Sequence, residues 1–330
     1  MLKLVKYLRG YVKEAIIGPL FKFLEACFEL IVPLVMAGII DRGIKVSDTA
    51  YIFKMGAIMI FLGILGLVCS ITAQYFAAKA ALGFGTALRN AMFAHINSLS
   101  FSEIDRIGTS TLITRLISDI NQVQVGVNLV LRLFLRSPFI VIGAIIMALL
   151  INAGLTLIFL AVTLLISVVI YFIMSYSIPH YKKVQNKLDK VSLITRENLS
   201  GVRVIRAFSR QKDEISRFGE SVNDLTRTQV FVGKISALLN PATYTVLNLG
   251  IIAVLWFGGA SVYSGENTQG EVIALVSYMS QILLALIALA NLIIAFTRAS
   301  ASAIRINEIF AVTSSMREGH TVSMTGTENS

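Results

Sequence analysis

Charged residues are scarce in this sequence. Asp, Glu, Lys and Arg account for 15% of its 330 residues, whereas a typical soluble domain carries about 25%. Four long stretches contain none of them: 55–78, 137–179, 235–265 and 272–297. A helix that crosses a membrane needs roughly 20 mostly apolar residues. Buried helices of a large soluble protein would explain one such stretch but not four, so the composition predicts an all-α membrane protein with several spans.

Cysteine and histidine are also rare. Cys27 and Cys69 both lie in stretches expected to span the membrane, so we expect no disulfide between them. Two cysteines cannot complete a structural zinc site, and His95, His180 and His320 are far apart in the sequence. No metal site and no bound cofactor is therefore predicted within this chain.

Six membrane-spanning helices are expected, with boundaries near 15–40, 51–79, 125–151, 154–178, 237–263 and 271–298. Lysine and arginine concentrate in residues 1–14, 79–136 and 179–236, while the turns at 152–154 and 262–270 contain neither. Because these residues favour cytoplasmic loops, both termini are predicted in the cytosol, in a multi-pass protein of the cell membrane. The net charge of +10 then indicates contact with anionic lipid. It does not indicate a nucleic-acid partner, because no basic domain stands apart from the spans.

The first residues have a two-sided pattern. Leu4, Leu8, Tyr11, Val12 and Ala15 fall on one helical face, and Lys3, Lys6, Arg9 and Lys13 fall on another. A helix with this pattern can lie in the plane of the lipid headgroups. We therefore expect residues 1–14 to form an interfacial helix before a transmembrane domain of residues 15–310. A solvated basic tail is the alternative.

The segments 80–124 and 179–236 are much longer than a turn requires. Long connections without secondary structure are uncommon. These two contain few Pro or Gly residues and have helical spacing, as in the pair Arg115 and Asp119. We predict that four of the spans continue beyond the bilayer as two long cytoplasmic helical hairpins. The outer connections are short, so contacts with other proteins are expected on the cytoplasmic side.

The first hairpin is expected to turn near residues 99–108. Ser102 is a candidate N-cap with Asp105 three residues later, a spacing typical of a capping box, and Gly108 allows the chain to reverse. A short helix here would present Phe101 and Ile104 sideways.

The second hairpin is expected to turn near residues 199–208. On a continuous helix, Arg196, Arg203, Arg206 and Arg210 share one face, and Val202 and Ile205 share another. The pattern alone leaves ordinary solvated turns as the alternative for both hairpin ends.

Three stretches, 101–119, 196–208 and 298–310, occur in order along this six-span pattern. Together they make the chain resemble the transmembrane domain of an ABC exporter half-transporter, of the bacterial multidrug type that works as a heterodimer. The resemblance implies that the two hairpin ends are coupling helices, which dock on nucleotide-binding domains. It implies this role for Phe101, Ile104, Asp105, Arg106, Leu199, Gly201, Val202, Arg203, Arg206 and Phe208.

The same resemblance implies partners and a reaction. A second half-transporter, identical or different, completes the pathway, and nucleotide-binding domains bind ATP and Mg to drive efflux of lipophilic, drug-like or peptide substrates. This chain has no G-x-x-x-x-G-K-S/T motif: Gly265 and Gly270 have the glycine spacing, but Glu271 and Val272 follow. No ATPase residues are therefore found, and residues 311–330 are expected to be a linker toward an absent nucleotide-binding domain. A membrane scaffold or sensor that signals through the hairpins is the alternative function.

Several polar residues fall inside the expected spans, where ionisable groups usually have a function. Lys22 can pair with Glu25, which leaves Glu29 without a partner in its own helix. Glu29 either faces water near the inner headgroups or lines a cavity that favours cationic substrates. The candidates for lining a translocation cavity are Glu25, Glu29, Asn128, Tyr244, Asn248, Gln281 and Asn291.

Some polar positions in the spans also have simpler explanations. Asn128, Arg132 and Arg136 follow one another at four-residue spacing along the third helix, and the two arginines are expected to snorkel toward the interface. Asp41 closes the first span on the outer side. It is a candidate for an outer gate, or it simply ends the helix.

Overall fold

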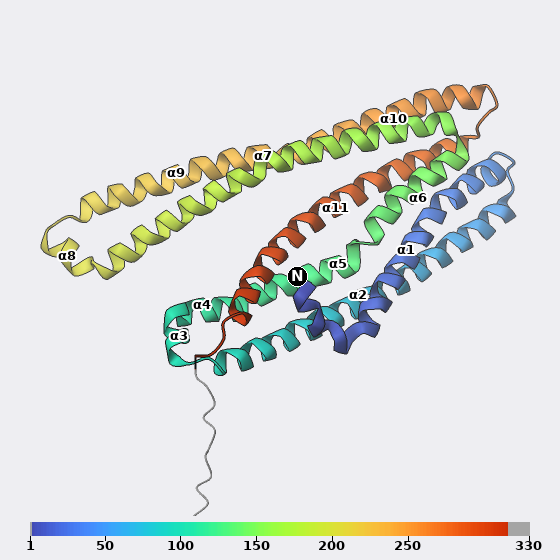
Figure 1. The fold of residues 1–330 in the computed structure, drawn as a ribbon. Helices are drawn as coiled ribbons and strands as arrows, with labels where there is room; N and C mark the ends of the chain where they lie inside the picture. The colour runs from blue at the N-terminus through green and yellow to red at the C-terminus, as the bar shows by residue number, and fades with distance from the viewer. Residues whose placement is uncertain (1, 316–330) are drawn as a thin grey trace, which may run out of the picture. The chain divides into compact units, whose positions relative to one another are not determined.

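The computed structural model describes residues 2–315, and all the regular structure of that range is helical (Figure 1). Six helical stretches are long and apolar enough to cross a membrane: Lys3–Ile44, Thr49–Asn97, Thr109–Ile151, Ala153–Ser200, Gln211–Tyr263 and Gln269–Phe310. Each expected span lies inside one of them, which confirms an all-α protein with six transmembrane helices. Residues 316–330, most of the expected linker, lie outside the described residues.

The chain forms two compact units. One comprises the residues up to Val35, Ile52–Ile142 and the residues from Ile287 onward, and the other comprises Met36–Tyr51 and Gly143–Leu286. The first unit contains η1 (Leu2–Tyr11), most of α1 (Val12–Gly38) and α2 (Thr49–Asn97), α3 (Phe101–Ile107), α4 (Thr109–Thr114), η3 (Arg115–Asp119) and α5 (Ile120–Leu133). The second contains η2 (Ile39–Ile44), α7 (Ala153–Ser200), α8 (Val202–Ala207), α9 (Gln211–Ala237) and α10 (Leu239–Tyr263). Helices α6 (Arg136–Ile151) and α11 (Gln269–Phe310) contribute to both units.

The core of the first unit gathers helices from both ends of the chain. Its buried apolar side chains come from η1, α2, α4, α5 and α11: Leu4, Phe84, Leu88, Met92, Leu112, Ile120, Val123, Ala303, Ile306 and Ile309. Tyr7 of η1 stacks on Phe310, with ring centroids 6.0 Å apart. Protein therefore covers apolar residues of η1 that were expected to lie against lipid, while its basic residues stay exposed.

Two helices are far longer than a membrane requires. Helix α2 runs for 49 residues and α7 for 48, which corresponds to about 70 Å each, against roughly 30 Å of hydrocarbon core. In the second unit α7 lies beside α9 and α10 (Figure 1). Ion pairs join α7 to α9: Lys187 to Asp224 at 2.6 Å and Glu197 to Arg217 at 3.0 Å. The two long helical hairpins are thereby confirmed.

Local signals set the ends of several helices. The side chain of Asn152 accepts a hydrogen bond from the backbone N–H of Leu155 (3.0 Å) and so caps α7, at the turn predicted there. Helix α5 ends at Leu133 and α6 begins at Arg136. Asn128, Arg132 and Arg136 therefore do not belong to one uninterrupted helix, because the backbone turns between the second and the third of them.

Candidate functional site

Helix α3 forms the end of the first hairpin. Its cap is not the predicted Ser102: the helix follows Ser100, whose backbone N–H donates to Oε2 of Glu103 (3.0 Å). Ser100 and Glu103 have the same spacing as Ser102 and Asp105. The earlier pair forms the cap because Glu103 also accepts a hydrogen bond from the Ser100 hydroxyl. Gly108, at φ +84°, allows the reversal as predicted.

Glu103 is the buried acidic residue of this helix, with 8% of its surface exposed. Hydrogen bonds from the hydroxyls of Ser100 and Ser315, joined by the backbone N–H groups of the same residues, outweigh burial and lower the pKa of Glu103 to about 2. The carboxylate therefore stays ionised at neutral pH. The stabilisation from these bonds would be lost only as the pH falls from 4.5 toward about 2.

The apolar residues of α3 face different surroundings. Phe101 is 84% exposed, and Asp105 and Arg106 are exposed as well. Ile104 instead packs against the core of the first unit. The expectation that Ile104 is presented beside Phe101 is therefore wrong, because the apolar core lies against the side of α3 on which Ile104 falls.

Helix α8 forms the end of the second hairpin. It is separated from α7 by Gly201 and from α9 by a turn that includes Ser209, at φ +54°. The four arginines expected on one helical face are thus distributed over separate elements: Arg196 on α7, Arg203 and Arg206 on α8, and Arg210 just before α9. The predicted common face is wrong, because the two breaks redirect the chain.

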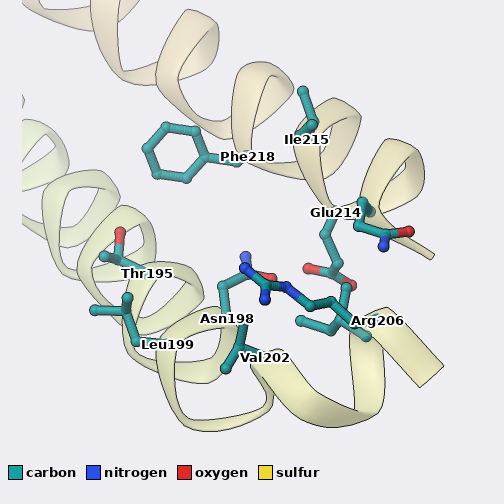
Figure 2. A pocket seen from close by; sticks show the side chains of 10 residues that line it. Thr195, Asn198, Leu199, Val202, Arg206, Glu214, Ile215 and Phe218 are labelled. Atoms are coloured by element: carbon teal, nitrogen blue, oxygen red, sulfur yellow. The ribbon is translucent and has the colours of Figure 1, made fainter. Parts of the chain in front are cut away.

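A groove of about 430 Å³ lies beside α8, between α7 and α9 (Figure 2). Its lining comprises Thr195, Asn198, Leu199, Val202, Ile205, Arg206, Gln211, Glu214, Ile215 and Phe218. At its edge Leu199 is 74% exposed, as is Phe208 at the end of α8. The contribution of Ile215 and Phe218 was not predicted, although their three-residue spacing on α9 is a signal that could have found them.

Helices α1, α2 and α6 surround a cavity of about 300 Å³ within the first unit. Lys22 donates to both carboxylate oxygens of Glu25 (2.8 and 2.6 Å), as predicted, and to the hydroxyl of Ser70 (3.3 Å). Glu29 pairs with Arg136 of α6 at 2.7 Å. Arg136 was expected to extend toward the headgroups, but it turns instead to a carboxylate 107 positions away in the sequence.

The charges of this cavity differ in exposure. The side chains of Lys22, Glu25 and Arg136 are 9%, 15% and 21% exposed, whereas that of Glu29 is 37% exposed. The other lining residues are almost all apolar: Phe28, Val32, Leu62, Gly63, Gly66 and Leu67, with Ser70. The cavity therefore offers one open carboxylate, paired with an arginine, among apolar walls.

The other cavity candidates lie elsewhere on their own units. In the first unit Asn128 is half-buried and Asn291 is exposed, and neither lines the cavity at Glu29. In the second unit Tyr244 and Asn248 are exposed on α10, and Gln281 is half-buried on α11. Their role in a translocation path stays a prediction.

Asp41 joins two elements of the second unit. Its carboxylate, on η2, accepts hydrogen bonds from the hydroxyl of Thr268 (2.5 Å) and from the backbone N–H of Gly270 (3.0 Å). These donors belong to the start of α11, where unpaired backbone N–H groups favour a negative charge. Asp41 thus does more than end a span, and its part in an outer gate stays a prediction.

Asp119 connects the first hairpin to the last helix. Its predicted pair with Arg115 is present at 2.9 Å. Arg305 of α11 also donates to both carboxylate oxygens, from Nε at 3.0 Å and from Nη2. Burial opposes ionisation of Asp119, but the hydrogen bonds from Arg305, Ser302 and Arg115 outweigh it and lower its pKa. Nothing in the sequence spacing pointed from Arg305 to Asp119.

Within residues 2–315, no group of three or more His, Cys, Asp or Glu side chains is placed to hold a metal ion. The described residues offer two kinds of site: exposed short helices at the ends of long hairpins, and a mainly apolar cavity with charged residues among spanning helices. Both have the form of binding surfaces.

Comparison with known proteins identifies the family. The family described as the ABC transporter transmembrane region matches residues 15–286. The chain belongs to the ABC transporter transmembrane family. The resemblance to the transmembrane domain of an ABC transporter is thereby confirmed, while the multidrug type and the heterodimer stay predictions.

This ABC transporter transmembrane region is similar to parts of longer proteins. Uncharacterized ABC transporter ATP-binding proteins of Mycobacterium bovis and Mycobacterium tuberculosis are each 34% identical over 308 residues, 93% of this chain and 53% of theirs. The uncharacterized ABC transporter ATP-binding protein YfiB of Bacillus subtilis is 31% identical over 323 residues, 98% of this chain and 56% of its own. A putative export ATP-binding/permease protein of Rickettsia typhi is 26% identical over 286 residues, which are 84% of this chain and 48% of its own. The chain spans about half the length of the curated relatives it matches.

Proposed function

We propose that this chain is the membrane-spanning half of an ATP-driven exporter and forms half of the path for a lipophilic, drug-like or peptide substrate. The observation that carries the proposal is the pair of exposed aromatic residues at the hairpin ends, Phe101 at 84% and Phe208 at 74% exposure. A large apolar side chain at the end of a rigid arm is suited to anchor a partner protein. Membership of the ABC transporter transmembrane family supports this use of the two ends.

The partners proposed for the hairpin ends are nucleotide-binding domains, which would bind ATP and Mg. Around Phe101, the exposed Asp105 and Arg106 supply polar contacts at the edge of the α3 surface. Around Phe208, the groove beside α8 adds an apolar recess with Arg206 at its wall. The names of the relatives describe ATP-binding proteins, and the name of the Rickettsia typhi protein also describes a permease, which supports this pairing.

A second half-transporter is proposed as the other partner, identical to this chain or different from it. Six spanning helices are too few to enclose a path for a drug-sized molecule, whereas two sets packed together could surround one. Movement of the nucleotide-binding domains would draw the hairpin ends together and turn the enclosed path outward. The transport step itself then needs no catalytic side chain from this chain.

The proposed orientation places the hairpins and both termini in the cytoplasm, in the cell membrane. The support is the distribution of basic residues: they are frequent in 79–136 and 179–236 and absent from the turns at 152–154 and 262–270.

The proposed substrate contact is the cavity of α1, α2 and α6. Glu29 is its most exposed charge, beside Glu25 and among apolar side chains, an arrangement suited to an apolar molecule with a cationic group.

The proposal is tested by transport in liposomes that contain the complete transporter built from this chain. We expect ATP hydrolysis that depends on Mg and drives uptake of substrate into inverted liposomes. In the Phe208→Ala variant, substrate moved per ATP should fall about tenfold, the usual scale for loss of an anchoring aromatic residue. The matched control is Tyr263→Ala, which removes an aromatic side chain that is 96% exposed at the end of α10, an element that forms neither hairpin end.

A membrane scaffold or sensor predicts a different result. Such a protein would show neither substrate-dependent ATP hydrolysis nor transport, and Phe208→Ala would alter only the binding of a signalling partner. That pair of observations would overturn the exporter proposal.

A further inference from the structure

The chain that leaves α11 returns to the end of the first hairpin. Beyond Phe310, the hydroxyl of Ser315 lies 3.1 Å from that of Ser100, the residue that caps α3. The Ser100 hydroxyl in turn donates to the carboxylate of Glu103. The segment that follows α11 is therefore in contact with the start of α3.

The last residues of α11 also contact α2 and η1. Nε2 of His95, near the end of α2, lies 3.0 Å from the backbone carbonyl of Ile309, to which it donates. The ring of Phe310 contacts those of His95 and Tyr7, with centroids 5.4 and 6.0 Å away. A hydrogen bond to the backbone, aromatic contacts and a hydroxyl contact thus fix residues 309–315 at positions from the end of α11 to the start of α3.

The carboxylate of Glu103 accepts more than one hydrogen bond at the start of α3. Glu103 accepts the backbone N–H of Ser100, which fixes the start of α3 (3.0 Å). It also accepts a hydrogen bond from the Ser100 hydroxyl, which in turn lies 3.1 Å from the hydroxyl of Ser315. Hydrogen bonds to an ionised acceptor are roughly twice as strong as those between neutral groups. Because Glu103 is almost fully enclosed, water competes little for these donors.

We propose that Glu103 is a positioning residue, which fastens the segment after α11 to α3 so that the two move as one body. The proposal rests on the function proposed for α3 as a contact to nucleotide-binding domains. Motion delivered to α3 would then reach α11 directly through residues 311–315, as well as through the longer route along α4, η3 and α5. Without the fastening, α3 could shift while α11 stayed in place, and ATP would be used with less transport.

The first measurement is the coupling of transport to ATP hydrolysis in the complete transporter. Glu103→Ala should keep ATP hydrolysis but lower substrate moved per ATP by about fivefold, the factor that corresponds to the net contribution of one typical hydrogen bond. The matched control is Glu308→Gln, which removes an exposed carboxylate two positions before Phe310 and leaves Glu103 intact. Equal coupling in the wild type and Glu103→Ala would overturn the proposal.

A disulfide separates fastening from helix capping, since Glu103→Ala also removes the cap of α3. In a Cys27→Ala, Cys69→Ala background, Ser100→Cys and Ser315→Cys place two thiols where hydroxyls now lie 3.1 Å apart. We expect mild oxidation to cross-link this pair, and the cross-linked transporter to keep its coupling. When Glu103→Ala is added, oxidation should restore the lost coupling, and reduction with dithiothreitol should abolish it again.

Two results would contradict the proposal. If the disulfide stops transport, the two segments must separate during the cycle and do not move as one body. If the disulfide fails to restore coupling in Glu103→Ala, the carboxylate acts on α3 alone. Formation of the cross-link requires neither ATP nor substrate, so it tests the contact even if the transporter proves not to be driven by ATP.

Discussion

Glu29 and Arg136 form the ion pair on which the charge of the intramembrane cavity depends. Lys22 and Glu25 are the more enclosed pair, with side chains 9% and 15% exposed, so their charges are largely matched within the protein. Glu29 is open to the cavity, and Arg136 beside it is about half as exposed. The sign of the charge offered to a ligand therefore depends on which of these two positions carries the carboxylate.

Exchange of the two residues should change the preferred ligand charge while keeping the ion pair. We expect wild-type transporter to be stimulated more by tetraphenylphosphonium than by tetraphenylborate, which have the same shape and opposite charge. The double variant Glu29→Arg, Arg136→Glu should shift the ratio of their half-maximal concentrations about tenfold toward the anion, equivalent to about 1.4 kcal/mol. An unchanged ratio in a stable, active double variant would show that the pair only holds α1 to α6.

The buried carboxylate of Asp119 is stabilised more by the distant Arg305 than by Arg115, four residues before it. Arg305 makes two hydrogen bonds to the buried carboxylate and Arg115 makes one. We expect Arg305→Ala to lower the free energy of unfolding by about 2 kcal/mol and Arg115→Ala by about 1 kcal/mol, since the 39% exposure of Arg305 limits its contribution. Thermal unfolding in detergent measures both variants. Equal losses would contradict the greater weight given to the two-bond contact.

At the scale of elements, α5 and α11 approach closely because one residue lacks a side chain. A Cβ at Gly126 would lie 2.3 Å from the Cβ of Ala299, a distance that neither atom can relieve by rotation. Small residues allow spanning helices to pack in this way. The contact also brings α11 against the base of the first hairpin, near Arg305.

Gly126→Ala should therefore push α5 and α11 apart and cost about 1–3 kcal/mol, as overpacking does elsewhere. The matched control is Gly219→Ala on α9, where an added Cβ has no other atom within 4 Å. That change should gain up to about 1 kcal/mol from helix propensity. The midpoints of thermal unfolding should move in opposite directions, and a Gly126→Ala variant as stable as the wild type would contradict this account.

The elements were largely predictable from sequence because long uncharged runs leave few alternatives in a membrane. The hairpin ends were predicted to within a few residues, because the apolar spacing of the flanking helices stops there. The cap of α3 was not predictable, because Ser100 with Glu103 and Ser102 with Asp105 have the same local spacing, and the pattern alone does not choose between them. Partners such as Arg136 for Glu29 were missed because single-helix patterns contain no information about pairs between helices.

At the scale of the whole molecule, the proposed orientation can be tested with single cysteines. In a background without Cys27 and Cys69, cysteines replace Ser102 and Ser209 at the two hairpin ends and Ser264 at the turn after α10, all three exposed. A membrane-impermeant maleimide should label the Ser264→Cys protein in intact cells. It should label the other two only after the membrane is permeabilised. The reverse pattern would place the hairpins outside.

The packing of η1 against α11 has a consequence for the synthesis of the protein. Tyr7 rests on Phe310, and Ile306 and Ile309 share the buried core that holds Leu4. Ribosomes add about 5–20 residues per second, so the roughly 300 residues between these contacts take on the order of 15–60 s to synthesise. During that interval η1 is already made but the surface that receives it is incomplete. Insertion of the last helix is therefore the step that lets the first one dock.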